Sequence, residues 1–562
     1  MRMIHTHIGW AAARAQDGFT MIIAMGVMFV TSLLLVAAFT AANGDIHLSN
    51  DDTIQKEAYY AALAGIQEYQ FRLEKEPDYW QTCVAPTSIV PEAESERYEI
   101  KLLPANGEKA CSTAAPFATM IESKGQAANT FRIESIGCAG KTELTSCAGQ
   151  PKSSVAVRKI VASFKATGFL QFVYFTRYED EDPALYSPKA NCETYFEVKG
   201  VKRPSECQLI EFITGDSVKG PMHTDDTAVL CGNPEFGRPG RATPDKVEIN
   251  GGLDETCSSK PVFNTATKSF IKGHNELVPP TSDESLASYV EPAYKFSGVT
   301  QLTLNGTTNK ITVINNGETK EVNWPENGLI YVEKAAACGY TFTGAGADGP
   351  KEKGQEANCG NVYVHGTYSK SLTIAGQNDL IISGSLYPTS VASSLGSEPS
   401  GTATLGLIAS EFVRVYHAVQ ETYKPSFGNN CNNGDPFNNG TKLCEDQNTL
   451  KSCDAPNLNA SEDEKAGGYG YGSQENIWIY AAILSTKHSF TVDNYHCGNK
   501  LEKLNVYGAI AQNFRGIVKN GEHGYDKNYN YDERLAADEP PYFLQPLNTG
   551  WEVNRETAPE GG

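Results

Sequence analysis

The sequence predicts an α+β chain in which a long N-terminal helix crosses a membrane, packs on an antiparallel sheet and is followed by a β-rich domain. An uncharged apolar run begins at residue 19, and apolar residues continue at helical spacing through 53–74. Most later segments are short apolar runs separated by Gly, Pro and Asn, which is typical of strands and turns. With 562 residues, of which 40% are hydrophobic, the chain has room for several packed domains.

The apolar run over residues 19–42 has the length of a membrane span. Its 24 residues would extend about 36 Å as a helix, and the hydrocarbon core of a bilayer is about 30 Å thick. Arg2 and Arg14 precede the run, which places the N-terminus in the cytoplasm. We therefore expect a single-pass protein of the cytoplasmic membrane with an extracytoplasmic C-terminal domain.

Residues 17–23, Asp-Gly-Phe-Thr-Met-Ile-Ile, resemble the start of proteins of the type IV pilin superfamily. Members carry a short leader that ends in glycine, an aromatic or methionine first mature residue, and a long hydrophobic helix. The resemblance implies a leader over 1–18, cleavage between Gly18 and Phe19 by a prepilin peptidase, and N-methylation of Phe19. It also implies the membrane, other pilin subunits and the pilus assembly machinery as partners.

One position departs from the pattern of that family. Pilins usually carry a glutamate at the fifth mature position, where it pairs with the N-terminal amine of a neighbouring subunit, and this chain has Ile23. An unpaired charge in the bilayer costs roughly 2.5–3.5 kcal/mol on insertion scales, so a subunit without that glutamate is poorly suited to repeated stacking. The resemblance therefore implies a minor subunit that acts in assembly, tip capping or adhesion at the cell surface, with an unknown surface ligand.

Two simpler explanations of the apolar run stay open. Thr40-Ala41-Ala42 offers a small-residue cleavage site for a secretory signal peptide, which would give a secreted surface protein, although the apolar region of such a peptide is only about 7–15 residues long. An ordinary signal anchor would explain the span but not the Gly18-Phe19 junction.

The region of the N-terminal helix is expected to cover 19–80. Within it the apolar pattern ends just before Pro77, which is expected to end the helix itself. An antiparallel sheet with the character of a pilin sheet is expected to follow over 81–178. Its predicted strands are 98–103, 119–122, 131–136, 155–164 and 169–178.

A linker is predicted over 179–225, because the acidic run 179–182 followed by Pro183 is typical of a hinge, although it could also be a surface turn. The remaining residues, 226–562, are expected to form the β-rich domain. Its short strands with turn residues between them, clearest in 362–387, favour a short β-solenoid (β-helix). No strict repeat length is visible, so a β-sandwich remains the alternative.

All fourteen cysteines follow the span, as expected for disulfides in an oxidising compartment. No two are closer than nine positions, which excludes the CxxC spacing of many zinc and redox sites. Local spacing suggests the pairs Cys83 with Cys111, Cys138 with Cys147, Cys192 with Cys207, Cys231 with Cys257, and Cys338 with Cys359. The other four allow three pairings and are Cys431, Cys444, Cys453 and Cys497.

A net charge of −20 argues against nucleic acid as a partner, because phosphate binding needs a basic surface. No nucleophile elbow, P-loop or HExxH motif occurs, so we expect no catalytic residue, no cofactor and no enzymatic activity. The competing hypothesis is a membrane-anchored extracellular enzyme, a carbohydrate-active β-helix, whose paired carboxylates the sequence cannot locate.

Two stretches weakly suggest a site. His223, Asp225 and Asp226 could ligate a metal or serve acid–base chemistry, but such a turn is more often a surface turn. The run 344–349 matches GxGxxG, yet Pro350 follows it instead of a helix, so a disulfide-closed loop explains it better.

A polar stretch near the C-terminus partly matches a calcium loop. Tyr531 and Ala537 stand where an EF-hand needs glycine and glutamate, so a polar strand face is the better explanation and no metal is expected. The weak calcium candidates are Asp526, Asn528, Asn530 and Asp532. The Asn-rich segment 429–464 is expected to be a solvated loop, and the Gly-Tyr run 467–472 a flexible linker.

Overall fold

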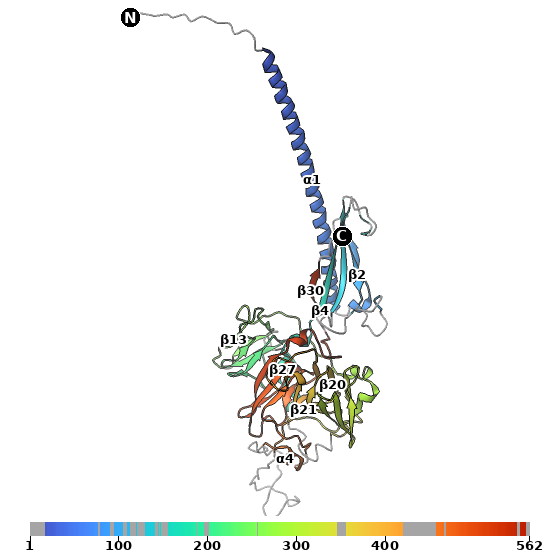
Figure 1. Cartoon of the computed structure of the whole chain (residues 1–562). Helices are drawn as coiled ribbons and strands as arrows, with labels where there is room; N and C mark the ends of the chain where they lie inside the picture. The colour runs from blue at the N-terminus through green and yellow to red at the C-terminus, as the bar shows by residue number, and fades with distance from the viewer. Residues whose placement is uncertain are drawn as a thin grey trace, which may run out of the picture. The chain divides into compact units, whose positions relative to one another are not determined.

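The computed structural model is α+β and divides into two compact units (Figure 1). The small unit contains Met1–Met120, Phe131–Phe164 and Val553–Gly562, and the large unit contains Ile121–Thr130 and Lys165–Glu552. The structure describes residues 17–76, 79–89, 95–104, 110–112, 120, 130–140, 144, 146–147, 155–186, 188–195, 200, 202–255, 257–344, 356–419, 457–465, 468–547 and 551–557.

The N-terminal helix α1 (Asp17–Lys75) is one uninterrupted element of 59 residues. No proline occurs within it, and its membrane half is dominated by Ala, Leu, Met and other apolar residues. Arg72 and Lys75 occupy its last turn, where cations interact favourably with the helix dipole. The helix therefore continues from the apolar run into the folded part of the small unit, as expected.

The small unit also contains a five-stranded sheet in the order β1-β2-β3-β4-β30. Its strands are β1 (Thr87–Ile89), β2 (Glu96–Leu103), β3 (Thr130–Gly140), β4 (Val155–Ala166) and β30 (Trp551–Thr557). The pairs β1–β2 and β2–β3 are antiparallel, as predicted. The C-terminal strand β30 was expected in the β-rich domain, but it joins this sheet.

One face of α1 is buried in the small unit at Ala58, Ala61, Ala62, Ile66, Tyr69 and Leu73. These positions repeat at three- and four-residue spacing, so they form a single stripe. A Cβ on Gly137 of β3 would lie 2.9 Å from the Cα of Ala62 and closer still to the carbonyl oxygen of Ala58. Small residues on both elements thus let the helix and the sheet approach at backbone distance.

The strands of the large unit pair mostly in parallel. A first ladder runs in the order β11 (Val247–Ile249), β8 (Met222–Thr224), β5 (Tyr174–Glu181), β27 (Lys500–Arg515), β25 (Ala482–Ser485), β22 (Leu405–Ala409), β20 (Leu372–Gly376), β18 (Leu329–Glu333) and β14 (Lys295–Ser297). A second ladder runs in the order β13 (Val262–Phe263), β10 (Glu235–Phe236), β7 (Ser217–Lys219), β29 (His523–Tyr531), β27, β24 (Ile477–Ile479), β21 (Leu380–Pro388), β19 (Val362–Tyr368) and β15 (Thr300–Asn305).

Shorter elements complete the large unit. A third parallel group contains β12 (Gly252–Glu255), β9 (Thr227–Cys231) and β6 (Phe212–Ile213), and β23 (Val413–Val415) and β26 (Phe490–Val492) extend the second ladder from β21. The antiparallel strands are β16 (Lys310–Asn315), β17 (Glu318–Asn323) and β28 (Lys519–Asn520). The short helices among the described residues are η1 (Tyr79–Thr82), η4 (Phe169–Gln171), α2 (Pro183–Tyr186), η5 (Glu284–Ser288), η6 (Pro292–Tyr294), η7 (Thr389–Val391), α4 (Ala460–Lys465) and η8 (Glu533–Ala536).

The core of the large unit lies between these ladders. Alternate strand residues such as Val364 and Ile382 point into it and have no exposed surface, and the parallel pairing of β19 with β21 places these two residues in register. A second apolar cluster, with Leu329, Ile408 and Leu484, covers the other face of the first ladder. That ladder is therefore buried on both faces, which is typical of parallel sheets.

The boundary between the units differs from the predicted one. Segment 169–178 was expected in the small sheet, but β5 pairs with β27 and β8 inside the large unit. The predicted linker 179–225 contains strands β6 to β8 and is also part of the large unit. The acidic run is not a hinge, because Glu179, Asp180 and Asp182 are fully buried. The predicted strand 119–122 lies outside the described residues apart from Met120.

Five disulfides join the pairs that the spacing suggested: Cys83–Cys111, Cys138–Cys147, Cys192–Cys207, Cys231–Cys257 and Cys338–Cys359. Each joins cysteines that are close in sequence. Cys431, Cys444 and Cys453 lie outside the described residues, and Cys497 is buried.

Candidate functional sites

The N-terminal part of α1 has the features of a membrane anchor or signal. Met21–Thr40 is long and apolar enough to cross a bilayer, and none of it is buried inside the protein. The hydroxyls of Thr31, Ser32 and Thr40 donate to backbone carbonyls within the same helix. Hydrocarbon offers no other partner to these groups, so the helix satisfies its polar side chains internally.

The residues of the predicted processing site lie at the start of this helix. Gly18 and Phe19 fall within the bounds of α1, and Ile23 presents an apolar, half-exposed side chain. The exposed surface of the helix from Met21 to Thr40 therefore carries no carboxylate.

The structure brings His223 and Asp225 together, as one of the sequence motifs suggested. His223 lies on β8 with its Nε2 2.9 Å from Asp225 and its Nδ1 2.7 Å from Glu248. Burial opposes protonation of the ring, but hydrogen bonds to the two carboxylates raise the pKa of His223 to about 9. A protonated imidazole donates from both nitrogens, so it has no lone pair for a metal.

The third residue of that motif, Asp226, belongs to a different group. Its Oδ2 accepts from the backbone N–H of Glu179 at 3.1 Å and lies 3.5 Å from Arg203. Arg203 also lies 2.9 Å from Asp180. Burial raises the pKa of Asp180 to about 7, although Arg203 opposes this shift. The three predicted residues therefore do not converge on one point.

Two fully buried arginines, which the sequence did not single out, organise further ion pairs. Arg515, near the end of β27, lies 3.1 Å from Glu179 and stacks at 3.5 Å on the ring of Phe212. Arg414 on β23 lies 2.7 Å from Asp493 and 3.2 Å from Asp379. A signal was present in the sequence, because Arg414 stands between two valines in an apolar strand, where a charge has to be paired.

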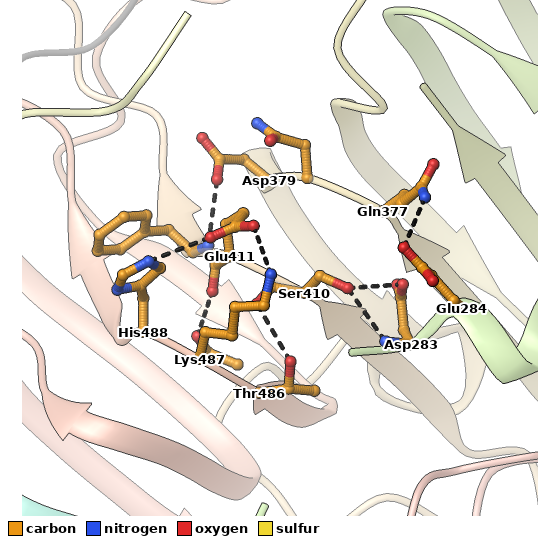
Figure 2. Close-up of polar contacts among 12 residues, drawn as sticks. Asp283, Glu284, Gln377, Asp379, Ser410, Glu411, Thr486, Lys487 and His488 are labelled. Atoms are coloured by element: carbon orange, nitrogen blue, oxygen red, sulfur yellow. Dashed lines mark hydrogen bonds and ion pairs between the residues drawn. The ribbon is translucent and has the colours of Figure 1, made fainter. Parts of the chain in front are cut away.

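A further cluster lies at the turns between the two ladders (Figure 2). His488 is 2.9 Å from Asp182 and 3.1 Å from Glu411, and its ring stacks at 4.3 Å on Phe412. Burial lowers its affinity for a proton, but the two acidic partners raise the pKa of His488 to about 9. Although burial acts in the opposite sense, His488 and Lys487 lower the pKa of Glu411 to about 2.

Asp283 lies beside this cluster and accepts from the hydroxyl of Ser410 at 2.8 Å (Figure 2). Burial raises the pKa of Asp283 to about 7, although Ser410 and Tyr331 oppose the shift. One carboxylate with a raised pKa beside one with a lowered pKa is a pattern of acid–base catalysis. Asp283 has no exposed surface, however, so a substrate cannot reach it here.

The space beside one of the buried arginines is small. A cavity of ≈ 10 Å³ lies between Arg515, Lys527 and aromatic residues, which is room for about one water. In the described part of the chain, no group of three or more His, Cys, Asp or Glu side chains is arranged to hold a metal ion. The charged groups of these clusters form ion pairs with one another within the large unit.

The weak calcium candidates lie in and just after strand β29. Asp526 pairs with Lys519 and, at 3.5 Å, with Lys500. Asn528 and Asn530 follow at two-residue spacing along the strand, and Asp532 lies 2.7 Å from Arg534. The carboxylates of Asp526 and Asp532 are thus paired with lysine and arginine side chains. The four candidates follow one another along and just after the strand, so they do not surround a common point where an ion could bind.

Two further sequence motifs are the Gly-Tyr run and the GxGxxG stretch. The Gly-Tyr run 467–472 is not a flexible linker: the ring of Tyr469 lies 4.3 Å from Tyr363, and the Tyr471 hydroxyl donates to Gln301 at 2.8 Å. Its rings cover strand β19. The GxGxxG stretch begins at Gly344, but 345–350 lie outside the described residues, as do 429–456 of the Asn-rich segment.

No family model matches the chain, and no curated protein matches it. A search of solved structures finds a likeness to the crystal structure of the competence-associated pilin ComZ from Thermus thermophilus. The alignment covers 91% of this chain and 98% of that chain, with 10% sequence identity and a TM-score of 0.24. A TM-score this low does not establish a common fold.

Proposed function

We propose that the chain is a minor, membrane-anchored pilin-like subunit of a type IV filament or a related one, which acts at an end of the filament in assembly, capping or adhesion. The observation that carries the proposal is the form of α1. One half of this continuous helix is an exposed apolar span, and the other half packs on an antiparallel sheet through a single buried stripe of alanines and larger apolar residues.

Two features support a position at an end. Ile23 leaves the apolar span without the carboxylate that a neighbouring N-terminal amine would need. The large unit, Lys165–Glu552, is also far wider than the roughly 10 Å between packed helix axes, so repeated copies would crowd one another. We propose one or a few copies per filament, with no enzymatic activity and no nucleic acid as a partner.

We also propose that the large unit is a short β-solenoid. The parallel pairing of successive strands in three ladders supports this form, because a β-sandwich is built from antiparallel strands.

The decisive experiment is terminal mass spectrometry of the protein from its membrane. The proposal expects a mature chain that starts at N-methylated Phe19, and Gly18→Ala should block cleavage. Gly26→Ala is the matched control, because a Cβ there meets no atom within 4 Å. A start at Asn43 would show secretion by a signal peptide, and an intact Met1 would show an ordinary anchor.

Position is tested separately by immunogold labelling of filaments. Label at the ends is expected, and regular label along the shaft would contradict the proposal. Ile23→Glu should leave membrane insertion largely intact and change incorporation.

A further inference from the structure

The small unit builds its sheet from two distant parts of the chain. Strand β4 ends at Ala166, and its sheet neighbour β30 begins at Trp551. Residues 167–550 lie between them in sequence and belong to the large unit. In an unfolded chain, β30 would have to find β4 across a loop on the order of 390 residues.

Folding of the large unit removes most of that loop. Within this unit the Lys165 ammonium donates to the carbonyl of Ala536, and the Tyr531 hydroxyl donates to the carbonyl of Leu170 at 2.7 Å. A Cβ on Gly168 would lie 3.5 Å from the Cδ of Gln545. The first and last segments of the large unit are therefore in contact once it has folded.

The effect on β30 can be estimated from loop closure. The probability that two chain points meet falls with about the 3/2 power of the residues between them. Replacing a loop of about 390 residues by one of about ten raises this probability roughly two-hundredfold. The sheet of the small unit can thus be completed readily only after the large unit has folded.

We propose that this topology works as a folding checkpoint: β30 docks on β4 only in chains whose large unit is folded. The inference rests on chain order and on contacts within the large unit, and it holds whether or not the protein enters a filament. In a chain with an unfolded large unit, β4 keeps an open edge, and open edges favour wrong pairing.

Pulse-labelled hydrogen exchange during refolding of the full chain in detergent micelles tests the order. Amides of the ladder strands β20 and β22 should become protected before those of β30. The proposal sets no order for the protection of amides in β2 and β3. Protection of β30 before the ladders would overturn the proposal.

A pair of variants tests the same dependence at equilibrium. Ile382→Asp places a charge in the core of the large unit, whereas Thr319→Asp changes an exposed residue of β17. Ile382→Asp should abolish protection of β30 but leave β2 and β3 protected, and Thr319→Asp should change neither. Retained protection of β30 in a chain whose ladders exchange freely would contradict the checkpoint.

The dependence should also run in one direction. Deletion of 553–557, the part of β30 that belongs to the small unit, should leave exchange in the ladders of the large unit unchanged, because among the described strands those of the ladders pair with one another and not with β30. Loss of ladder protection in this variant would show mutual dependence of the two units and would sink the proposed order.

Discussion

The two units bury polar groups in opposite ways. The contact between α1 and its sheet is made by alanines, apolar side chains and the bare backbone at Gly137. The large unit buries two arginines with almost no exposed surface, and it holds buried His223 and partly buried His488 between carboxylates. The small unit therefore depends on close fit, while the large unit depends on charge balance.

The largest expected effect comes from breaking a buried charge set. Arg414→Met leaves Asp379 and Asp493 buried without their cation, so we expect a loss of about 3–5 kcal/mol in the unfolding free energy of the large unit. Chemical denaturation of the ectodomain measures it. Adding Asp379→Asn and Asp493→Asn to the same chain should restore part of the loss. A loss below about 1 kcal/mol would contradict the claim that the large unit depends on its balanced buried charges.

Alkaline pH should weaken the large unit selectively. The pKa values of His223 and His488 are about 9 in the folded protein and 6.5 in the unfolded chain. Their contribution to the unfolding free energy is therefore complete below pH 6.5 and is lost as the pH rises to about 9. Each shift corresponds to roughly 3 kcal/mol at most. Asp180 and Asp283, with pKa values raised to about 7, act in the same sense at lower pH. Thermal unfolding at pH 6 and pH 9 should show a lower Tm at pH 9.

Two histidine variants sharpen the assignment of that pH dependence. His223→Gln should flatten the fall in Tm. His365→Gln should steepen it slightly, because burial lowers the pKa of His365 and its contribution to stability therefore rises with pH. Equal pH profiles in both variants would show that the buried pairs are not the cause.

A single added methyl group should disturb the small unit. Gly137→Ala would place its Cβ against the backbone of α1 at Ala58 and Ala62, so we expect a loss of about 1–3 kcal/mol. Hydrogen exchange of β3 amides reports this loss. Lys101→Ala, at an exposed position of β2, is the control and should leave the exchange rates unchanged.

The smallest effect is expected at a surface ion pair of the large unit. Lys310 and Glu321 lie 3.6 Å apart with 40% and 61% of their side chains exposed. Lys310→Ala should change the unfolding free energy by less than about 0.5 kcal/mol. A loss as large as that of Arg414→Met would mean that burial does not decide the strength of these pairs.

Local patterns predicted the parts of the structure that depend on short-range spacing. The stripe from Ala58 to Leu73 follows from helical periodicity, and each of the five disulfides joins neighbouring segments. The partners of the buried charges could not be found in this way, because Glu179 and Arg515 are more than three hundred positions apart. For the same reason no local signal placed β30 beside β4.

The chain crosses between the units after Met120, Thr130, Phe164 and Glu552, and the last two crossings bear on the path of a mechanical load. A force on the large unit leaves it through the peptide bonds after Phe164 and after Glu552, and so it enters two neighbouring strands, β4 and β30. If the large unit is pulled while α1 stays anchored, both β4 and β30 have to separate from their sheet before the connection becomes an unfolded chain. We expect such a two-strand connection to resist force better than a single linker.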